Sequence, residues 1–172
     1  ENNFCADPLN YLVKNRVDAR IELTDETLSK IIEYHHSKKI EYRGQPLLKN
    51  GKQSSGNVFL LDEPCFKQLK LIIESEITKY RQKFDYSQEG FIRYWPKNYD
   101  LFGWIVSMKE GGKLEPHNHK EGWLSGCLYL RLPSCGDKKL DEGKISFSDT
   151  GVHYPSLNVP SKKLVLDIAE RD

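Results

Sequence analysis

Apolar residues change their spacing near Gly90, and this change limits what the chain can fold into. Before Gly90 they recur every three to four positions, which is the period of an amphipathic helix. After it, short runs rich in β-branched and aromatic residues alternate with breaks that contain Gly, Pro and Asn, as is typical of strands. Several short strands after helices predict a mainly β fold with flanking helices, built as a sandwich or barrel. We expect one domain over residues 1–172, helical over 1–88 and β-rich over 89–172.

Two helices are expected in the first part of the chain. Thr24 or Asp25 can cap the first helix, which should end near Lys38. Asp62 can cap the second, because Pro64 then occupies the first turn, where its missing N–H costs nothing. Both segments have an apolar stripe that should face a core.

Residues 43–57 combine Gly, Pro, Asn and Ser, which predicts a loop that connects the two helices. Strands are expected in the second part, over residues 91–95, 102–109, 124–132, 144–148 and 163–168.

Charge and cysteine content exclude several classes of partner. The chain has 26 basic and 25 acidic residues, for a net charge of +1, so no excess of positive charge is available to bind nucleic acid or an anionic membrane. It has no apolar run of the roughly 20 residues that span a membrane, and no signal peptide at its start. The four cysteines do not have metal-binding or redox-motif spacing, so we expect reduced thiols and a cytoplasmic location.

The sequence Pro116-His117-Asn118-His119 places two imidazoles one residue apart. On a strand, alternate side chains share a face, so His117 and His119 would stand about 7 Å apart and could bind one metal ion. Neutral imidazole is the commonest metal ligand, and mixed His and carboxylate sites with open positions suit non-haem iron. The same pair can also be two solvated histidines at a strand edge.

The run Gly103–Gly112, followed by the two histidines and by Trp123–Leu130, resembles the iron(II)/2-oxoglutarate oxygenases found beside tetratricopeptide repeats. Gly143–Asp149 is similar to the next strand of that prolyl-hydroxylase-like family. The resemblance implies a double-stranded β-helix, or jelly roll, that binds Fe(II) and 2-oxoglutarate near its open mouth. It also implies a dioxygenase that hydroxylates a small-molecule or peptidyl substrate.

Residue by residue, the resemblance implies that His117 and His119 bind the metal, His119 standing where the wider superfamily usually has Asp. Tyr129 matches the tyrosine that contacts 2-oxoglutarate in prolyl-hydroxylase-like enzymes. On a strand over 124–132, Ser125 and Arg131 would share the face of Tyr129. Arg131 could therefore anchor the cosubstrate, or it could equally well reach a surface carboxylate. Trp123 is the aromatic residue expected to line the substrate pocket near the metal.

A facial triad needs a third ligand, normally a late-strand histidine followed by an arginine that pairs with 2-oxoglutarate. Neither is present after Lys163. We therefore expect a jelly roll truncated at its C-terminal end, in which an unpaired strand edge favours association. If the chain is complete, His153 or Glu121 is the candidate for the third ligand.

Two other function classes stay open at this point. A cupin-type metalloenzyme would also combine a Gly-rich turn, a His-x-His motif and barrel strands, although the glutamate spacing of this chain differs from the usual cupin pattern. A metal-free jelly-roll interaction module would use the same fold to bind a partner and would catalyse no reaction. Iron binding with 2-oxoglutarate turnover, metal binding alone, or neither would distinguish the three classes.

Overall fold

The computed structural model describes residues 4–37, 39–132, 143–149 and 161–172. The chain divides into two compact units, each built from segments that are distant in the sequence. One unit comprises residues 19–79 and 96–117, and the other comprises residues 1–18, 80–95 and 118–172. The expectation of a single domain stays a prediction.

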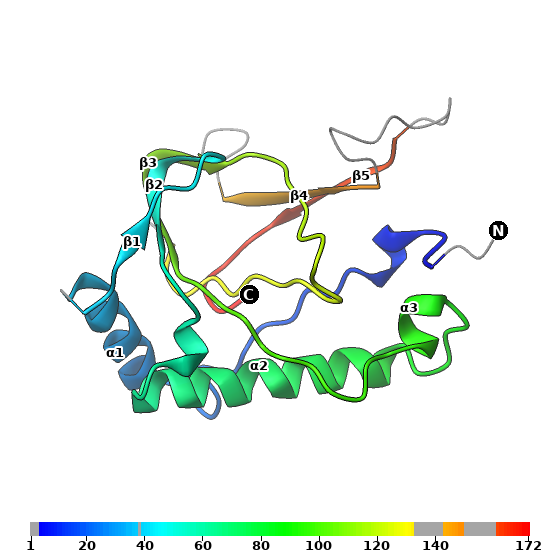
Figure 1. Cartoon of the computed structure of the whole chain (residues 1–172), viewed down its shortest axis with the longest axis horizontal. Helices are drawn as coiled ribbons and strands as arrows, with labels where there is room; N and C mark the ends of the chain where they lie inside the picture. The colour runs from blue at the N-terminus through cyan, green and yellow to red at the C-terminus, as the bar shows by residue number, and fades with distance from the viewer. Residues whose placement is uncertain (1–3, 38, 133–142, 150–160) are drawn as a thin grey trace. The chain divides into compact units, whose positions relative to one another are not determined.

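Helices α1 (Asp25–His36) and α2 (Pro64–Lys83) form where the apolar spacing predicted them (Figure 1). The Thr24 side chain accepts a hydrogen bond from the Thr27 N–H, so Thr24 is the N-cap of α1. The Thr27 hydroxyl donates to the Gln68 side chain of α2 at 2.8 Å. The Tyr34 ring meets Phe66, which is fully buried, edge-on with centroids 5.2 Å apart. These contacts pack the two helices against each other in the unit of residues 19–79 and 96–117.

The same unit contains a three-stranded antiparallel sheet of β1 (Tyr42–Arg43), β2 (Leu48–Ser54) and β3 (Val106–Leu114), in that order (Figure 1). The predicted loop over 43–57 is therefore wrong, because β2 pairs with β3, a segment more than 50 residues later. At the Asn-Gly pair within it, where Asn50 has a φ of 48°, the register with β3 shifts: Lys49 pairs with Lys113, but Gly51 pairs with Met108.

Strand β3 begins four residues later than predicted, because other contacts hold the residues before it. The Asn57 side chain accepts hydrogen bonds from the Phe59 and Gly103 N–H groups at 3.1 and 3.0 Å and donates to the Leu101 carbonyl at 2.9 Å. The segment before β3 is thus attached to the short 3₁₀ helix η2 (Val58–Leu60). The Asn57 side-chain amide, and not a neighbouring strand, makes these hydrogen bonds to the residues before β3.

In the second unit, the predicted strand over 91–95 is wrong, since this segment forms the short helix α3 (Gly90–Arg93). Phe91 and Ile92 are neighbours and are both buried, which a strand with one buried face could not achieve. They pack with Phe84 into a cluster that also includes Tyr11, which ends the 3₁₀ helix η1 (Pro8–Tyr11). The aromatic-rich composition that predicted a strand here therefore belongs to a helical turn.

Strands β4 (Lys144–Ser148) and β5 (Lys163–Asp167) confirm the two last predicted strands and form an antiparallel pair. Both alternate strictly between exposed and half-buried residues, as strands with one buried face do. The predicted strand over 124–132 is wrong, because these residues have no regular secondary structure. Tyr129 makes a strand-like exchange there: its N–H donates to the Asp172 carbonyl at 2.8 Å and its carbonyl accepts from the Arg171 N–H at 2.6 Å.

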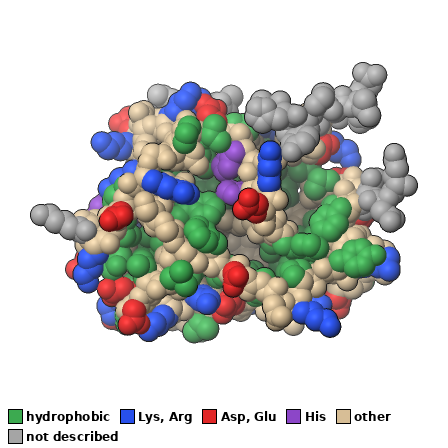
Figure 2. Space-filling view, in the orientation of Figure 1, with side chains coloured by type: hydrophobic (Ala, Val, Ile, Leu, Met, Phe, Trp, Pro, Cys, Tyr) green, Lys and Arg blue, Asp and Glu red, His purple; other side chains and the backbone are tan. Residues whose placement is uncertain are grey.

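Antiparallel sheets with flanking helices agree with the predicted fold class, while closure into a jelly roll stays a prediction. Basic and acidic side chains are interspersed on the face shown in Figure 2, as the balanced composition implies. Among the described residues, no helix is both long and apolar enough to cross a membrane.

Candidate metal and cosubstrate site

His117 lies three residues beyond the end of β3, after Pro116, and its side chain is exposed. Its Nδ1 is 2.9 Å from the Glu115 carbonyl oxygen. Because a carbonyl oxygen can only accept, Nδ1 carries the proton in this contact and Nε2 carries a lone pair. This is the tautomer that a metal-binding imidazole needs when it coordinates through Nε2.

Glu115, which orients His117, is itself fixed to the three-stranded sheet. Its N–H donates to the Leu47 carbonyl at 2.9 Å. Its carboxylate pairs with Lys113 at 2.9 Å and with Lys49 at 3.1 Å, and these two ammonium groups, Lys113 first, lower the pKa of Glu115. The residue that precedes the motif therefore stays ionised and anchored. Sequence reasoning missed this role, because it depends on a backbone carbonyl and on β2.

His119 is the second residue of the last segment of the other unit, which begins at Asn118, and it is exposed. Its carbonyl accepts a hydrogen bond from the Gly122 N–H at 3.1 Å, which closes a turn that contains Glu121. A Cβ at Gly122 would lie 3.4 Å from the Ser125 hydroxyl oxygen, so the chain folds back on itself here. His119, Glu121 and Ser125 thus belong to a compact turn and bend. The strand alternation that was expected to align His117 with His119, and Ser125 with Tyr129, does not occur.

Trp123 is held in place at the surface of the same unit. Its Nε1–H donates to the Phe91 carbonyl of α3 at 2.9 Å. Its ring meets Phe4 edge-on at 5.0 Å between centroids, and 40% of the residue stays exposed. An aromatic side chain fixed by one polar contact and one ring contact can present its remaining surface to a ligand. The contacts of Trp123 with Phe4 and Phe91 were not predicted, because both partners are distant from Trp123 in the sequence.

Tyr129 is half-buried beside the C-terminal residues of the chain. Burial, followed by the Cys127 and Asp172 charges, raises the pKa of Tyr129 to about 12. The phenol is therefore protonated at neutral pH and can donate a hydrogen bond to an anion.

Arg131 is 62% exposed in its side chain, and its Nε lies 4.0 Å from a Glu170 oxygen. That same Glu170 oxygen accepts from the Leu132 N–H at 3.1 Å. The structure thus places Arg131 beside a surface carboxylate, one of the two environments that the sequence left open.

The structure groups the predicted site residues only in part. His117 belongs to the unit of residues 19–79 and 96–117, whereas the other described site residues belong to the second unit. His153 lies outside the described residues. Within the described ranges, no three His, Cys, Asp or Glu side chains form a metal-binding group. The two imidazoles fit an iron site by donor type, and His117 also by tautomer, but the described residues do not assemble a complete facial triad.

Comparison with known proteins gives a match to a protein family. Residues 103–166 match the family model described as "Putative 2OG-Fe(II) oxygenase". The matched region begins at the segment bound by Asn57, contains β3, both histidines, Tyr129 and β4, and ends within β5. It covers less than half of the chain. No curated protein and no solved structure matches the chain.

Proposed function

From the family match over residues 103–166, which confirms the resemblance to the 2-oxoglutarate- and iron(II)-dependent oxygenases, we propose that this chain is a non-haem iron(II)/2-oxoglutarate-dependent dioxygenase. The observation that carries the proposal is that the match contains both histidines and Tyr129 in one continuous region. We propose a jelly roll as the architecture of this region. When bound, iron(II) and 2-oxoglutarate would, with dioxygen as the oxidant, supply hydroxylation of a substrate C–H bond: one oxygen atom would enter the substrate and the other succinate, with release of carbon dioxide.

His117 and His119 are the proposed metal ligands. The Glu115 carbonyl supports the role of His117, because a hydrogen bond at Nδ1 fixes both the ring orientation and the tautomer. Glu121 lies two residues from His119 in the same turn and is the described candidate for the third ligand; His153 is the other candidate.

Tyr129, Ser125 and Arg131 are the proposed contacts to 2-oxoglutarate. The raised pKa of Tyr129 supports a donor role, because its hydroxyl stays protonated throughout the neutral pH range, in which the cosubstrate is ionised. The Arg131 guanidinium lies beside the Glu170 carboxylate at the long distance of 4.0 Å, so it can exchange Glu170 for a ligand carboxylate at small cost.

Trp123 is the proposed wall of the substrate pocket. Its partly exposed ring, held by Phe91 and Phe4, suits an apolar group of a small-molecule or peptidyl substrate. We further propose a cytoplasmic location, where reducing conditions keep thiols free, because Cys5, Cys65 and Cys127 are all unbridged in the structure.

Calorimetric titration with manganese(II), an inert substitute for iron(II), tests the metal site. We expect His117→Ala and His119→Ala each to weaken binding about tenfold or more, because each removes one of few protein ligands. The matched control is His36→Ala, which removes an exposed imidazole from the end of α1. Equal binding by all three variants would place the metal elsewhere.

Succinate formation from 2-oxoglutarate, measured after iron(II) has been loaded anaerobically and dioxygen has then been admitted, tests the chemistry. We expect turnover that depends on both histidines and that weakens on Tyr129→Phe through a higher KM for 2-oxoglutarate. A hydrogen bond to a charged group corresponds to about 1.5 to 3 kcal/mol, so the KM should rise roughly 10- to 150-fold. Metal binding without turnover of 2-oxoglutarate would indicate the cupin class. The absence of both metal binding and turnover would indicate an interaction module.

A further inference from the structure

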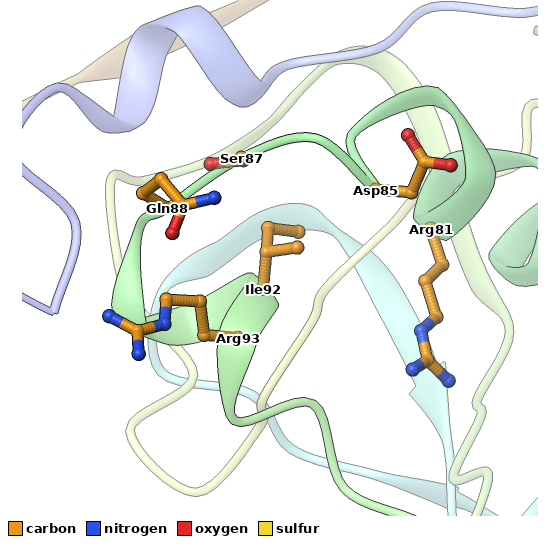
Figure 3. Close-up of a pocket in the computed structure, with 6 residues that line it drawn as sticks. All are labelled: Arg81, Asp85, Ser87, Gln88, Ile92 and Arg93. Atoms are coloured by element: carbon orange, nitrogen blue, oxygen red, sulfur yellow. The ribbon is translucent and has the colours of Figure 1, made fainter.

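A pocket of about 380 Å³ lies where the chain turns from the end of α2 into α3. Figure 3 shows the Ile92 side chain between Arg81, from the last turn of α2, and Arg93, from the end of α3, with Asp85 and Gln88 on the connecting segment. All six lining residues fall within residues 81–93. One continuous segment therefore forms this pocket by itself.

The two arginines of the pocket have aromatic neighbours in place of acidic partners. The Arg81 Cζ lies 5.9 Å from the centroid of the Trp95 ring, and the Arg93 Cζ lies 5.8 Å from that of Tyr94. Within the described part of the chain, neither guanidinium makes an ion pair, although 11 such pairs occur elsewhere. Stacked guanidinium groups of this kind retain donors for a carboxylate or phosphate.

The rest of the pocket is rigid and partly apolar. Ile92 is 6% exposed and belongs to the cluster with Phe84 and Phe91, so its position is fixed by packing. The buried Ser87 hydroxyl accepts from the Glu89 N–H at 3.2 Å and shares a 2.6 Å hydrogen bond with the Tyr11 hydroxyl. The segment that carries the two arginines is thereby held before any ligand arrives, which lowers the entropic cost of binding.

We propose that this pocket binds a small organic carboxylate with an apolar body. Two guanidinium groups and the Asp85 carboxylate give the lining a net charge of +1, which one bound carboxylate would neutralise. Ile92 offers an apolar surface to the body of the ligand, and the Gln88 amide adds a polar group at the rim. The volume is in the lower part of the range for small-molecule sites.

This site is independent of the proposed oxygenase function. Residues 81–93 precede the family match at 103–166, and none of the six lining residues is a proposed metal or cosubstrate contact. Failure of one proposal therefore leaves the other standing.

Titration of the ¹⁵N-labelled chain with isobutyrate, a branched monocarboxylate, tests the proposal by NMR. We expect saturable shifts in the backbone amides of residues 81–93 and a dissociation constant in the millimolar range, as for a ligand of so few atoms. Inorganic phosphate should bind more weakly. The absence of saturation, or tighter binding of phosphate, would overturn the proposal.

Variants locate the binding groups. Arg81→Gln and Arg93→Gln should each weaken isobutyrate binding about tenfold or more, since each removes a charge-assisted hydrogen bond. The control is Lys83→Gln, which removes an equal charge from the same end of α2 but outside the pocket. If Lys83→Gln weakens binding as much as the arginine variants do, the effect is general surface charge and the site does not exist.

Discussion

Gly103 shows how a single residue fixes the chain segment that leads into β3 and on to the two histidines. A Cβ at this position would lie 2.3 Å from Cε2 of the Phe59 ring, far inside van der Waals contact. The Gly103 N–H donates to the Asn57 side chain, and its carbonyl accepts from the Val58 N–H at 2.9 Å. A residue without a Cβ is thus required at this position, because Phe59 of η2 lies so close. The two backbone hydrogen bonds of Gly103 fix the position of the segment before β3.

We predict that Gly103→Ala lowers the free energy of unfolding by about 1–3 kcal/mol, the usual cost of forcing extra volume into a packed site. Urea denaturation followed by circular dichroism measures this loss. Gly44→Ala is the matched control, because a Cβ at Gly44 would meet nothing within 4 Å. Equal stability of the two variants would show that the contact with Phe59 is not maintained in solution.

At the level of elements, His35 connects α1 to the three-stranded sheet. The Tyr42 hydroxyl of β1 donates to the His35 carbonyl, so its oxygen is left to accept from His35 Nδ1–H at 2.9 Å. The buried His35 Nε2 has no hydrogen-bond partner among the described residues. The ammonium of Lys52, on β2, lies 3.8 Å from the centroid of the Tyr42 ring, and the His36 ring meets His35 edge-on. Burial, then Lys52 and His36, lowers the pKa of His35.

This lowered pKa predicts that acid weakens the packing of α1 on β1. As pH falls below the unfolded value of about 6.5, the unfolded chain binds a proton at His35 before the folded chain does, so the free energy of unfolding decreases. The slope contributed by His35 is at most about 1.4 kcal/mol per pH unit. The slope should be present between the folded and the unfolded pKa, and absent where both states are neutral or both are protonated.

Urea denaturation between about pH 7.5 and 5.5, on either side of the unfolded pKa, checks this slope. His35→Gln should reduce the slope, whatever its effect on stability at a single pH. His36→Gln, at the exposed neighbouring position, removes only the smallest of the three causes of the lowered pKa and should retain most of the slope. A slope that is unchanged in His35→Gln would assign the pH dependence to other groups.

At the scale of the whole molecule, strand pairing leaves edges that could join a second chain. Among the described residues, β4 pairs only with β5, and β3 pairs only with β2. Val165 on β5 is 47% exposed, in the middle of the strand. We propose that the chain self-associates through this edge, because exposed strands with apolar side chains are templates for further pairing.

Sedimentation velocity over a concentration series tests this proposal. We expect the sedimentation coefficient to rise with concentration, and Val165→Lys to suppress the rise, since lysine on an edge strand opposes pairing. Leu71→Lys is the control, as Leu71 is an apolar residue of α2 that is 66% exposed. Constant sedimentation of the parent chain would refute association, and equal suppression by both variants would refute the role of β5.

The sequence alone determined those features that arise from local patterns. Apolar periodicity predicted α1 and α2, because helix formation depends on residues three or four apart, and Thr24 was one of the two caps expected for α1. Short runs rich in β-branched and aromatic residues, bounded by breaks, predicted β4 and β5, which is also a local pattern. The His-x-His motif and its surroundings carried the family resemblance, since a motif needs only a short run of residues.

Only the tertiary structure decided the elements that depend on distant partners. Phe91 and Ile92 form a helix because a cluster with Tyr11 buries both, and no local pattern contains that cluster. The Asn57 side chain binds Gly103, in the segment that was predicted to begin β3. Where another strand was predicted, the chain bends so that Gly122 lies close to Ser125. Long-range hydrogen bonds and packing thus overrode strand propensity, because strand formation requires a neighbour that the local sequence cannot specify.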